Sequence, residues 1–304
     1  MTNIDKELLS QIADLHSTPE GAYSFRKNGE SQINSTAEIE IVQKTDKKGI
    51  DIYVKPNVKG KSLHIPVIVT KGGLTDVVYN DFHIGDGAEV TIVAGCGLHN
   101  VTQEDSAHNG IHSFRLGKNS VVNYIEKHLA LGEGTGGKIL NPVTQITMKA
   151  NSTFTMETTQ LGGVTSSDRV TKAKLAKNAK LVIKEKILTT NTQTANTKFY
   201  VDLVGEDSSV EVVSRSVAKD KSYQNFYSKV KGKNRCFGHV SCDGILVDNA
   251  RIDSTPQIVC ENVEATLVHE AAIGKIAGEQ LTKLMTMGLT EQEAEDLIIK
   301  GFLK

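Results

Sequence analysis

The 304-residue sequence contains no tryptophan, and aromatic residues make up only 5% of it. Carbohydrate clefts and base-stacking platforms depend on aromatic faces, so the composition argues against both kinds of site. The formal net charge is −1, which provides no global attraction toward nucleic acid or anionic lipid. We therefore expect neither a nucleic acid nor a membrane among the partners of this protein.

Long apolar runs are also missing. No stretch approaches the ~18 consecutive apolar residues of a membrane-spanning helix. The start, MTNIDKELLSQIADLH, lacks the apolar segment of a secretion signal. We expect a cytoplasmic protein. Its four cysteines form no CxxC pair, and in the cytoplasm free thiols or metal ligands are favoured over disulfides.

The sequence does contain an internal repeat. A nine-residue pattern recurs in steps of 26 to 32 residues, with copies that begin at Ile84 (IGDGAEVTI), Leu116 (LGKNSVVNY), Met148, Leu175, Val204, Val230 (a weaker copy) and Val259. In the six good copies the fourth position is Gly, Asn or Asp, which tolerate left-handed backbone angles. The seventh and ninth positions are apolar between polar neighbours, as in a half-buried strand. Each unit therefore predicts a strand, a tight corner and a second strand.

Repeats of this length and kind are typical of solenoids, because one unit cannot bury its apolar face alone whereas stacked units can. We predict a mainly β fold, a parallel β-solenoid over residues 35–268. Residues 1–34 are predicted to form an N-terminal segment with a short helix over 4–16, where apolar residues recur at helical spacing. A sandwich of ordinary hairpins remains the alternative, since turn signals recur at intervals there too.

Helical signals return after the repeats, and residues 269–304 are predicted to form a C-terminal helical cap. An amphipathic pattern indicates a helix over about 271–287, stopped by Gly288. Thr290 and Glu293 form a capping-box pair that begins a second helix. We expect this helix pair to cover the open end of the solenoid.

His269 and Glu270 stand side by side where a strand-like run meets the predicted helix. They resemble the start of an HExxH zinc motif, but Ile273 breaks that motif. Coils of a solenoid stack about 4.8 Å apart, and Cys242 precedes Glu270 by 28 residues, close to one repeat step. A thiolate, an imidazole and a carboxylate from neighbouring coils would suit iron. The alternative is that Cys242 is a small core residue and His269 a satisfied polar residue at a strand end.

The other chemistry-bearing stretches have plainer interpretations. Cys96 and Cys236 are predicted to be packing residues. Cys260 falls at the second position of its repeat copy and stays a lower-ranked candidate ligand. The glycine-rich stretch 131–139 lacks the GxxxxGK[ST] phosphate-loop pattern and precedes a strand-like run instead of a helix, so we interpret it as a flexible loop.

The stretch 241–303, which contains SCDGILVDN, TPQIVCENVEATLVHEAAIGKI and GLTEQEAEDLIIKGF, resembles the end of the SufB/SufD family of iron–sulfur cluster assembly proteins. TPEGAYSFRKNGE (18–30) is similar too, whereas the middle matches mainly in its repeat character. The resemblance implies a right-handed β-helix flanked by helical segments. It also implies a SufC-type ABC ATPase partner, for which the helical cap is the docking surface, and a nascent cluster where two β-helix proteins meet.

The resemblance also implies roles for single residues. Cys242 and Glu270 match the key assembly residues of SufB-like members, and His269 matches an important histidine of the SufD-like partner. Val268 stands where SufB-like members often have a glutamate, and the long helical domain and cysteine-rich insertion of SufB are missing from this sequence. Features of both paralogues in one short chain predict a homodimer, with a SufB/SufD paralogue as the alternative partner.

The leading hypothesis is therefore a scaffold for a transient iron–sulfur cluster that is not itself an enzyme and meets ATP only through its partner. The first alternative is a cytoplasmic β-solenoid enzyme of the acyltransferase kind. Such enzymes need contiguous six-residue repeats, whereas in this chain the repeat pattern occurs only once in each unit of 26 to 32 residues. The second is a passive structural solenoid, which leaves the Cys242, His269 and Glu270 set unexplained.

Overall fold

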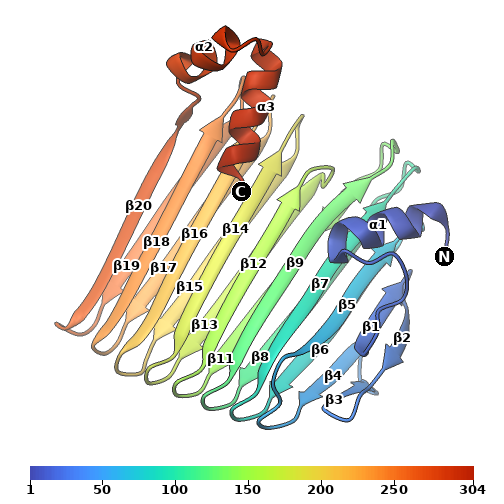
Figure 1. The fold of residues 1–304 in the computed structure, drawn as a ribbon, viewed down its shortest axis with the longest axis vertical. Helices are drawn as coiled ribbons and strands as arrows, with labels where there is room; N and C mark the ends of the chain where they lie inside the picture. The colour runs from blue at the N-terminus through green and yellow to red at the C-terminus, as the bar shows by residue number, and fades with distance from the viewer.

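A computed structural model describes residues 1–304 as a parallel β-solenoid of about eight turns with helices at both ends, which confirms the predicted fold class. Two ten-stranded sheets face each other, and the chain passes from one to the other at each corner (Figure 1). Coils pair in parallel, and only the N-terminal hairpins β1–β2 and β3–β4 are antiparallel. None of the three helices has the length and apolar character needed to cross a membrane.

The first sheet has the order β2 (Glu30–Asn34), β1 (Ala22–Lys27), β5 (Lys61–Val69), β7 (Glu89–His99), β9 (Val121–Leu131), β12 (Thr153–Leu161), β14 (Lys180–Thr189), β16 (Ser208–Ala218), β18 (Cys236–Leu246) and β20 (Ala265–Lys275). The second has the order β19 (Arg251–Cys260), β17 (Tyr223–Gly232), β15 (Thr194–Leu203), β13 (Ser166–Leu175), β10 (Lys138–Leu140), β8 (Ser106–Leu116), β6 (Thr75–Ile84), β4 (Gly49–Val54) and β3 (Ile39–Gln43), and β11 (Val143–Met148) lies between β13 and β8. We call the sheet faces that look into the solenoid inner and the opposite faces outer.

Left-handed residues make the corners from the second sheet to the first. Five of the six predicted corner residues have φ between 55° and 68°, namely Gly87, Asn119, Asn151, Asn178 and Asp207. The side-chain amide of Asn151 donates to Asn119 at 3.0 Å, and that of Asn178 donates to Asn151 at 3.0 Å. This ladder ties successive coils together at the positions that the repeat pattern identifies.

The N-terminal helix α1 (Asn3–Ala13) packs on the outer face of the first sheet, where Leu8 and Ile12 are fully buried. A Cβ on Gly97 of β7 would lie 3.0 Å from the Leu8 side chain, and one on Gly95 would lie 2.7 Å from the Ile12 carbonyl oxygen. The two glycines therefore allow the helix to approach the sheet closely. The predicted helix is confirmed, but the sheet begins at Ala22, before the predicted boundary at residue 35.

The C-terminal end differs more from the prediction. Strand β20 continues to Lys275 and α2 (Gly278–Thr286) follows it, so the predicted helix start near residue 271 is wrong. Pairing with β18 along all eleven residues of β20 outweighs the helical propensity of HEAAIGKIAG. Helix α3 (Glu291–Phe302) begins at the predicted capping box, where the Thr290 Oγ1 atom accepts from the Glu293 amide at 3.3 Å.

The two C-terminal helices do not cover the open end of the solenoid. Helix α3 folds back toward β14 and β16 (Figure 1). There the Arg215 guanidinium donates to the Phe302 carbonyl at 3.2 Å, and the Lys219 ammonium pairs with Glu295 at 2.7 Å. The expectation of a lid over the last coil is therefore wrong, and β19 and β20 remain as free edges.

Aromatic rings stack through the middle of the 37-residue core cluster. The rings of Phe82 and Phe114 stack at 4.2 Å, and Phe154 meets Phe114 edge-on at 5.0 Å. We expect Phe114→Ala to lower the free energy of unfolding by about 3–5 kcal/mol, because it leaves a cavity between coils. Urea unfolding followed by circular dichroism measures this loss, and Tyr79→Ala on an exposed outer face is the control. A loss no larger than that of the control would contradict the prediction.

Candidate functional site

The last two coils hold all the predicted ligands. Cys242 lies in the middle of β18 and faces inward, with 1% of its surface exposed. Burial raises the pKa of its thiol to about 11, although a hydrogen bond with Ser254 of β19 acts in the opposite direction. The thiol is therefore protonated at neutral pH, and a metal could bind its sulfur only by displacing that proton.

His269 lies on the inner face of β20, paired in register with Val240, while Cys242 pairs with Ala271. His269 and Cys242 are thus diagonal neighbours on one face, about 7 Å apart. The Nε2 atom of His269 is buried without a hydrogen-bond partner. Burial, with a smaller contribution from His239, lowers the pKa of this imidazole. A neutral imidazole with an unpartnered nitrogen is suited to bind a metal.

Glu270 points to the opposite face. It pairs in register with Ser241 on the outer face, and its side chain is 68% exposed. Its Oε2 atom lies 3.4 Å from Nε2 of His239, a residue of β18 that the sequence interpretation missed. Within CFGHVSCD, strand alternation places His239 and Cys242 on opposite faces of the sheet. Only the register with β20 shows that His239 lies next to Glu270.

Cys260 stands at the end of β19, exposed, and faces the corner that also holds Cys236. Cys242 lies six positions further along the strand than Cys236, which corresponds to about 20 Å. The structure therefore brings Cys242 and His269 together, and places Glu270 on the other face and Cys260 at another corner. No group of three or more His, Cys, Asp or Glu side chains in the chain is arranged to hold a metal ion.

The two ends of the solenoid differ in how their edges are protected. Antiparallel strands β2 and β3 form the edges of the N-terminal end. At the C-terminal end, β19 and β20 have unpaired backbone groups and expose apolar side chains, with Ile258 44%, Val268 39% and Ile273 37% exposed. Unprotected strand edges of this kind invite pairing with another chain.

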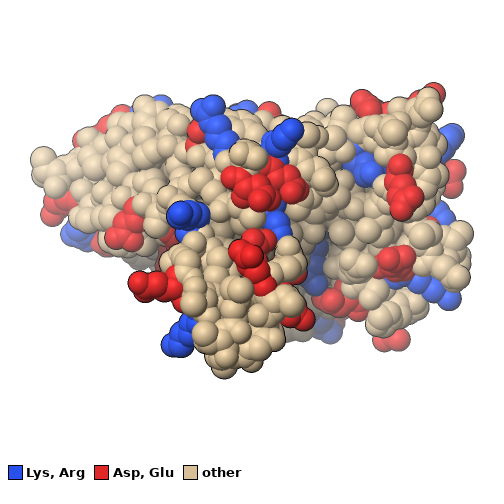
Figure 2. Space-filling model, turned by 90° about the horizontal axis from the view of Figure 1, so that it is seen from above, with Lys and Arg blue, Asp and Glu red and all other residues tan.

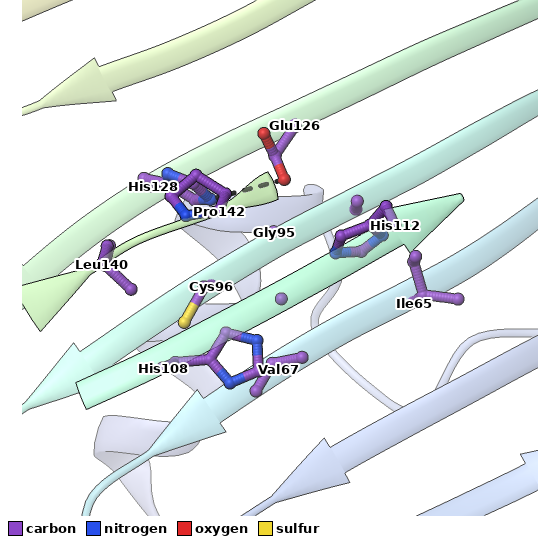
Figure 3. Close-up of a pocket in the computed structure, with 12 residues that line it drawn as sticks. Ile65, Val67, Gly95, Cys96, His108, His112, Glu126, His128, Leu140 and Pro142 are labelled. Atoms are coloured by element: carbon purple, nitrogen blue, oxygen red, sulfur yellow. Dashed lines mark ion pairs between the residues drawn. The ribbon is translucent and has the colours of Figure 1, made fainter. Parts of the chain in front are cut away.

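A second polar group lies buried in the middle of the solenoid (Figure 3), around an enclosed cavity of about 20 Å³ lined among others by Cys96, His108, His112, Glu126 and His128. The cavity has room for about one water molecule. Burial acts to raise the pKa of Glu126, but the Arg169 guanidinium at 2.6 Å and the neighbouring histidines hold it well below its usual value. The sequence interpretation placed Cys96 among packing residues, which its burial confirms. It missed the histidines, although HNGIH puts two of them on one face of a strand.

The buried His112 makes the stability of the fold depend on pH. Burial lowers the pKa of its imidazole to about 4, despite the attraction of Glu126. Between pH 6.5 and 4 the unfolded chain binds a proton at this residue and the folded chain does not, so its contribution to stability decreases as the pH falls through this window. We expect His112→Gln to reduce the loss of unfolding free energy between pH 7 and pH 4.5 by about 2 kcal/mol.

Denaturant unfolding at the two pH values measures this difference. His16→Gln, at an exposed position, serves as the control and should leave the pH dependence unchanged. An equal pH dependence in His112→Gln and the wild type would show that His112 is not the residue responsible.

The fold and site together define a parallel β-solenoid with one unpaired end, whose last two coils bring a thiol and an imidazole together on the inner face. The family model of the SufBD core domain of the SUF iron–sulfur cluster assembly system matches residues 70–302. The chain therefore belongs to the SufBD family, and its general role lies in iron–sulfur cluster assembly.

Curated relatives agree with this assignment. An iron–sulfur cluster assembly SufBD family protein of Pyrococcus horikoshii is 28% identical over 282 residues, which cover 89% of this chain and 83% of the relative. One of Methanocaldococcus jannaschii is 27% identical over 263 residues, covering 83% and 79%. A shorter match to one of Methanothermobacter thermautotrophicus is 41% identical over 105 residues, covering 34% and 26%.

Proposed function

We propose that this chain is a scaffold on which an iron–sulfur cluster is assembled where the open end of its solenoid meets a second solenoid. The second solenoid is another copy of the chain, or a SufB/SufD paralogue. The observation that carries the proposal is the open end of the solenoid, where Cys242 of β18 lies beside the unpartnered imidazole of His269 on the uncovered edge strand β20. The cluster is cargo that is built and then released, and the chain has no catalytic turnover of its own.

The ligand chemistry supports a shared site. A thiolate is a soft ligand for iron, and an imidazole completes a site that exchanges more readily than four thiolates. Since the chain alone assembles no three-ligand group, further ligands have to come from the second solenoid. Cys242 stays protonated and buried until iron arrives, which protects it from oxidation, because thiolates react and thiols do so far less.

Glu270 has a different place in this proposal. Its carboxylate and the imidazole of His239 lie together on the outer face, 3.4 Å apart. A carboxylate with an imidazole suits ferrous iron that must remain exchangeable. We assign these two residues to the delivery of iron to the open end, and Cys242 with His269 to the cluster itself.

A SufC-type ABC ATPase is proposed to drive the cycle, and ATP binds only through it. The glycine-rich loop leads into strand β10 and not into a helix, so no helix N-terminus is present there to hold a phosphate. Met285, Met287 and Leu297 of the α2–α3 region are 43%, 74% and 51% exposed, and they offer an apolar surface on which the ATPase could dock. Charged side chains of both signs lie on the face seen in Figure 2, where acidic side chains gather near the middle and basic side chains stand beside them.

We expect Cys242→Ser to abolish cluster formation while the fold is retained. Anaerobic reconstitution with iron and sulfide in the presence of the ATPase, followed by absorption spectroscopy, measures the cluster yield. Cys96→Ala, another buried thiol variant, is the matched control and should retain the yield, at some cost in thermal stability. His269→Ala is expected to weaken assembly. Glu270→Ala is expected to abolish it with ferrous iron at limiting concentration.

A wild-type cluster yield in Cys242→Ser would remove Cys242 from the site. An equal loss in Cys96→Ala would mean that the assay reports stability and not ligation.

The open end should also determine the oligomeric state. We expect a dimer in solution, and we expect Ile258→Lys to make it monomeric by placing a charge on the uncovered last coil. Light scattering coupled to size-exclusion chromatography measures the mass. Val101→Lys, at a 63% exposed position in a distant loop, should leave the dimer intact. If the wild-type chain is a monomer that associates only with a paralogue, the functional assembly is the heterodimer. If Ile258→Lys remains a dimer, the interface lies elsewhere on the chain.

A further inference from the structure

The corner that leads from the second sheet to the first has different residues in the last two coils than in the earlier ones. In the earlier coils a large aliphatic residue of the second sheet faces a small buried residue across the corner. The aliphatic row is Ile84, Leu116, Met148, Leu175 and Leu203, and the small row is Ala88, Ser120, Ser152, Ala179 and Ser208. In register, the first row continues as Gly232 and Cys260, and the second as Cys236 and Ala265. Cys260 therefore stands in the row of aliphatic residues, and Cys236 stands in the row of small residues, beside Gly232.

The thiols stand on adjacent coils of that corner. The Sγ atom of Cys236 lies 3.0 Å from the place that a Cβ on Gly232 would occupy. Cys260 stacks on Gly232 in register, one strand spacing of about 4.8 Å away. These two steps place the side chains of Cys236 and Cys260 on adjacent coils of the same corner, where side-chain rotation and a shift of the edge strand would join their sulfur atoms.

The two cysteines differ in accessibility. Cys260 is exposed on a strand with no neighbour beyond it, and Cys236 is 6% exposed beneath it. Burial raises the pKa of Cys236, and the negative charge of an ionised Cys260 adds to this effect. Cys260 is therefore the sulfur that an external reagent reaches first, and Cys236 is the one positioned to react second.

We propose that Cys236 and Cys260 form a reactive dithiol that a small-molecule disulfide oxidises reversibly to an intramolecular disulfide between the last two coils. The Cys260 thiolate attacks one sulfur of the oxidant RSSR, which forms a mixed disulfide and releases RS⁻. Cys236 then gives its proton to solvent and attacks the Cys260 sulfur, which releases the second RS⁻. Two cysteine thiols are oxidised, and one RSSR is reduced to two RSH after protonation.

The bond would tie the end of β19 to the start of β18, and so fix the last coil at the corner opposite the α2–α3 end of these strands (Figure 1). Cys242 takes no part, because it lies about 20 Å along the strand. The inference rests on the geometry of this corner and concerns the chain while its open end is not paired with a second solenoid, since Cys260 and Ile258 lie on the same face of β19.

The test uses the reduced full-length chain, glutathione disulfide as oxidant, and alkylation of the remaining thiols before trypsin digestion. Cleavage after Arg235, Arg251 and Lys275 places Cys236 and Cys242 in one peptide and Cys260 in the next. Mass spectrometry should find these two peptides cross-linked, with Cys242 alkylated, because the alkylation is carried out in denaturant. Dithiothreitol should restore both free peptides.

Two variants make the result specific. Cys236→Ser should stop at the glutathione adduct of Cys260, whereas Cys96→Ser should form the cross-link as the wild type does. The proposal is overturned if the wild type stops at the glutathione adduct, if Cys260 joins Cys242, or if the disulfide forms between two copies of the chain. It is also overturned if both thiols remain free while Cys260 is open to alkylation.

Discussion

Parallel strand pairing between coils is the constraint on which the rest of this structure depends. Each coil satisfies its backbone groups only through the coils before and after it. A stack built in this way must end, and the last coil then presents unpaired donors and acceptors together with one side of its apolar interior. At the N-terminal end, the antiparallel hairpins β1–β2 and β3–β4 form the last strands of the two sheets. At the C-terminus, the helices that could cover it fold back along β14 and β16, so β19 and β20 stay free.

Strand alternation divides the chemistry of that free end between two faces. Successive residues of a strand point to opposite sides of a sheet, so adjacent His269 and Glu270 cannot serve the same face. His269 joins Cys242 inside, and Glu270 joins His239 outside. This division would suit the proposed scaffold, since a buried thiol and a neutral imidazole would favour retention of a cluster, whereas an exposed carboxylate would favour exchange with solvent.

The interior is not uniformly apolar, and this affects both stability and chemistry. Charged residues in the middle coils are held in pairs, as with Glu126 and Arg169 at 2.6 Å, because an unpaired buried charge would be costly. Arg26 and Asp76 form a similar pair at 2.7 Å. Toward the open end the interior carries thiols at Cys236 and Cys242, and Cys260 stands exposed on the edge strand β19. The thiol on the edge strand is therefore accessible, whereas the two thiols one coil further in are buried.

The sequence alone determined the solenoid, because its corner residues and alternating strands recur with the coil, and local rules cover both features. It also determined α1 and the start of α3, whose caps and apolar spacing are local signals. It could not determine the end of β20, since pairing with β18 overrides the helical propensity of HEAAIGK. Nor could it show the face on which each candidate ligand lies: sequence spacing brought Cys242 within one coil of Glu270, but the register that opposes Ser241 to Glu270 and Ala271 to Cys242 is set by stacking. Only the tertiary structure could therefore separate these ligands, because a shift of one residue in register exchanges the two faces of a strand.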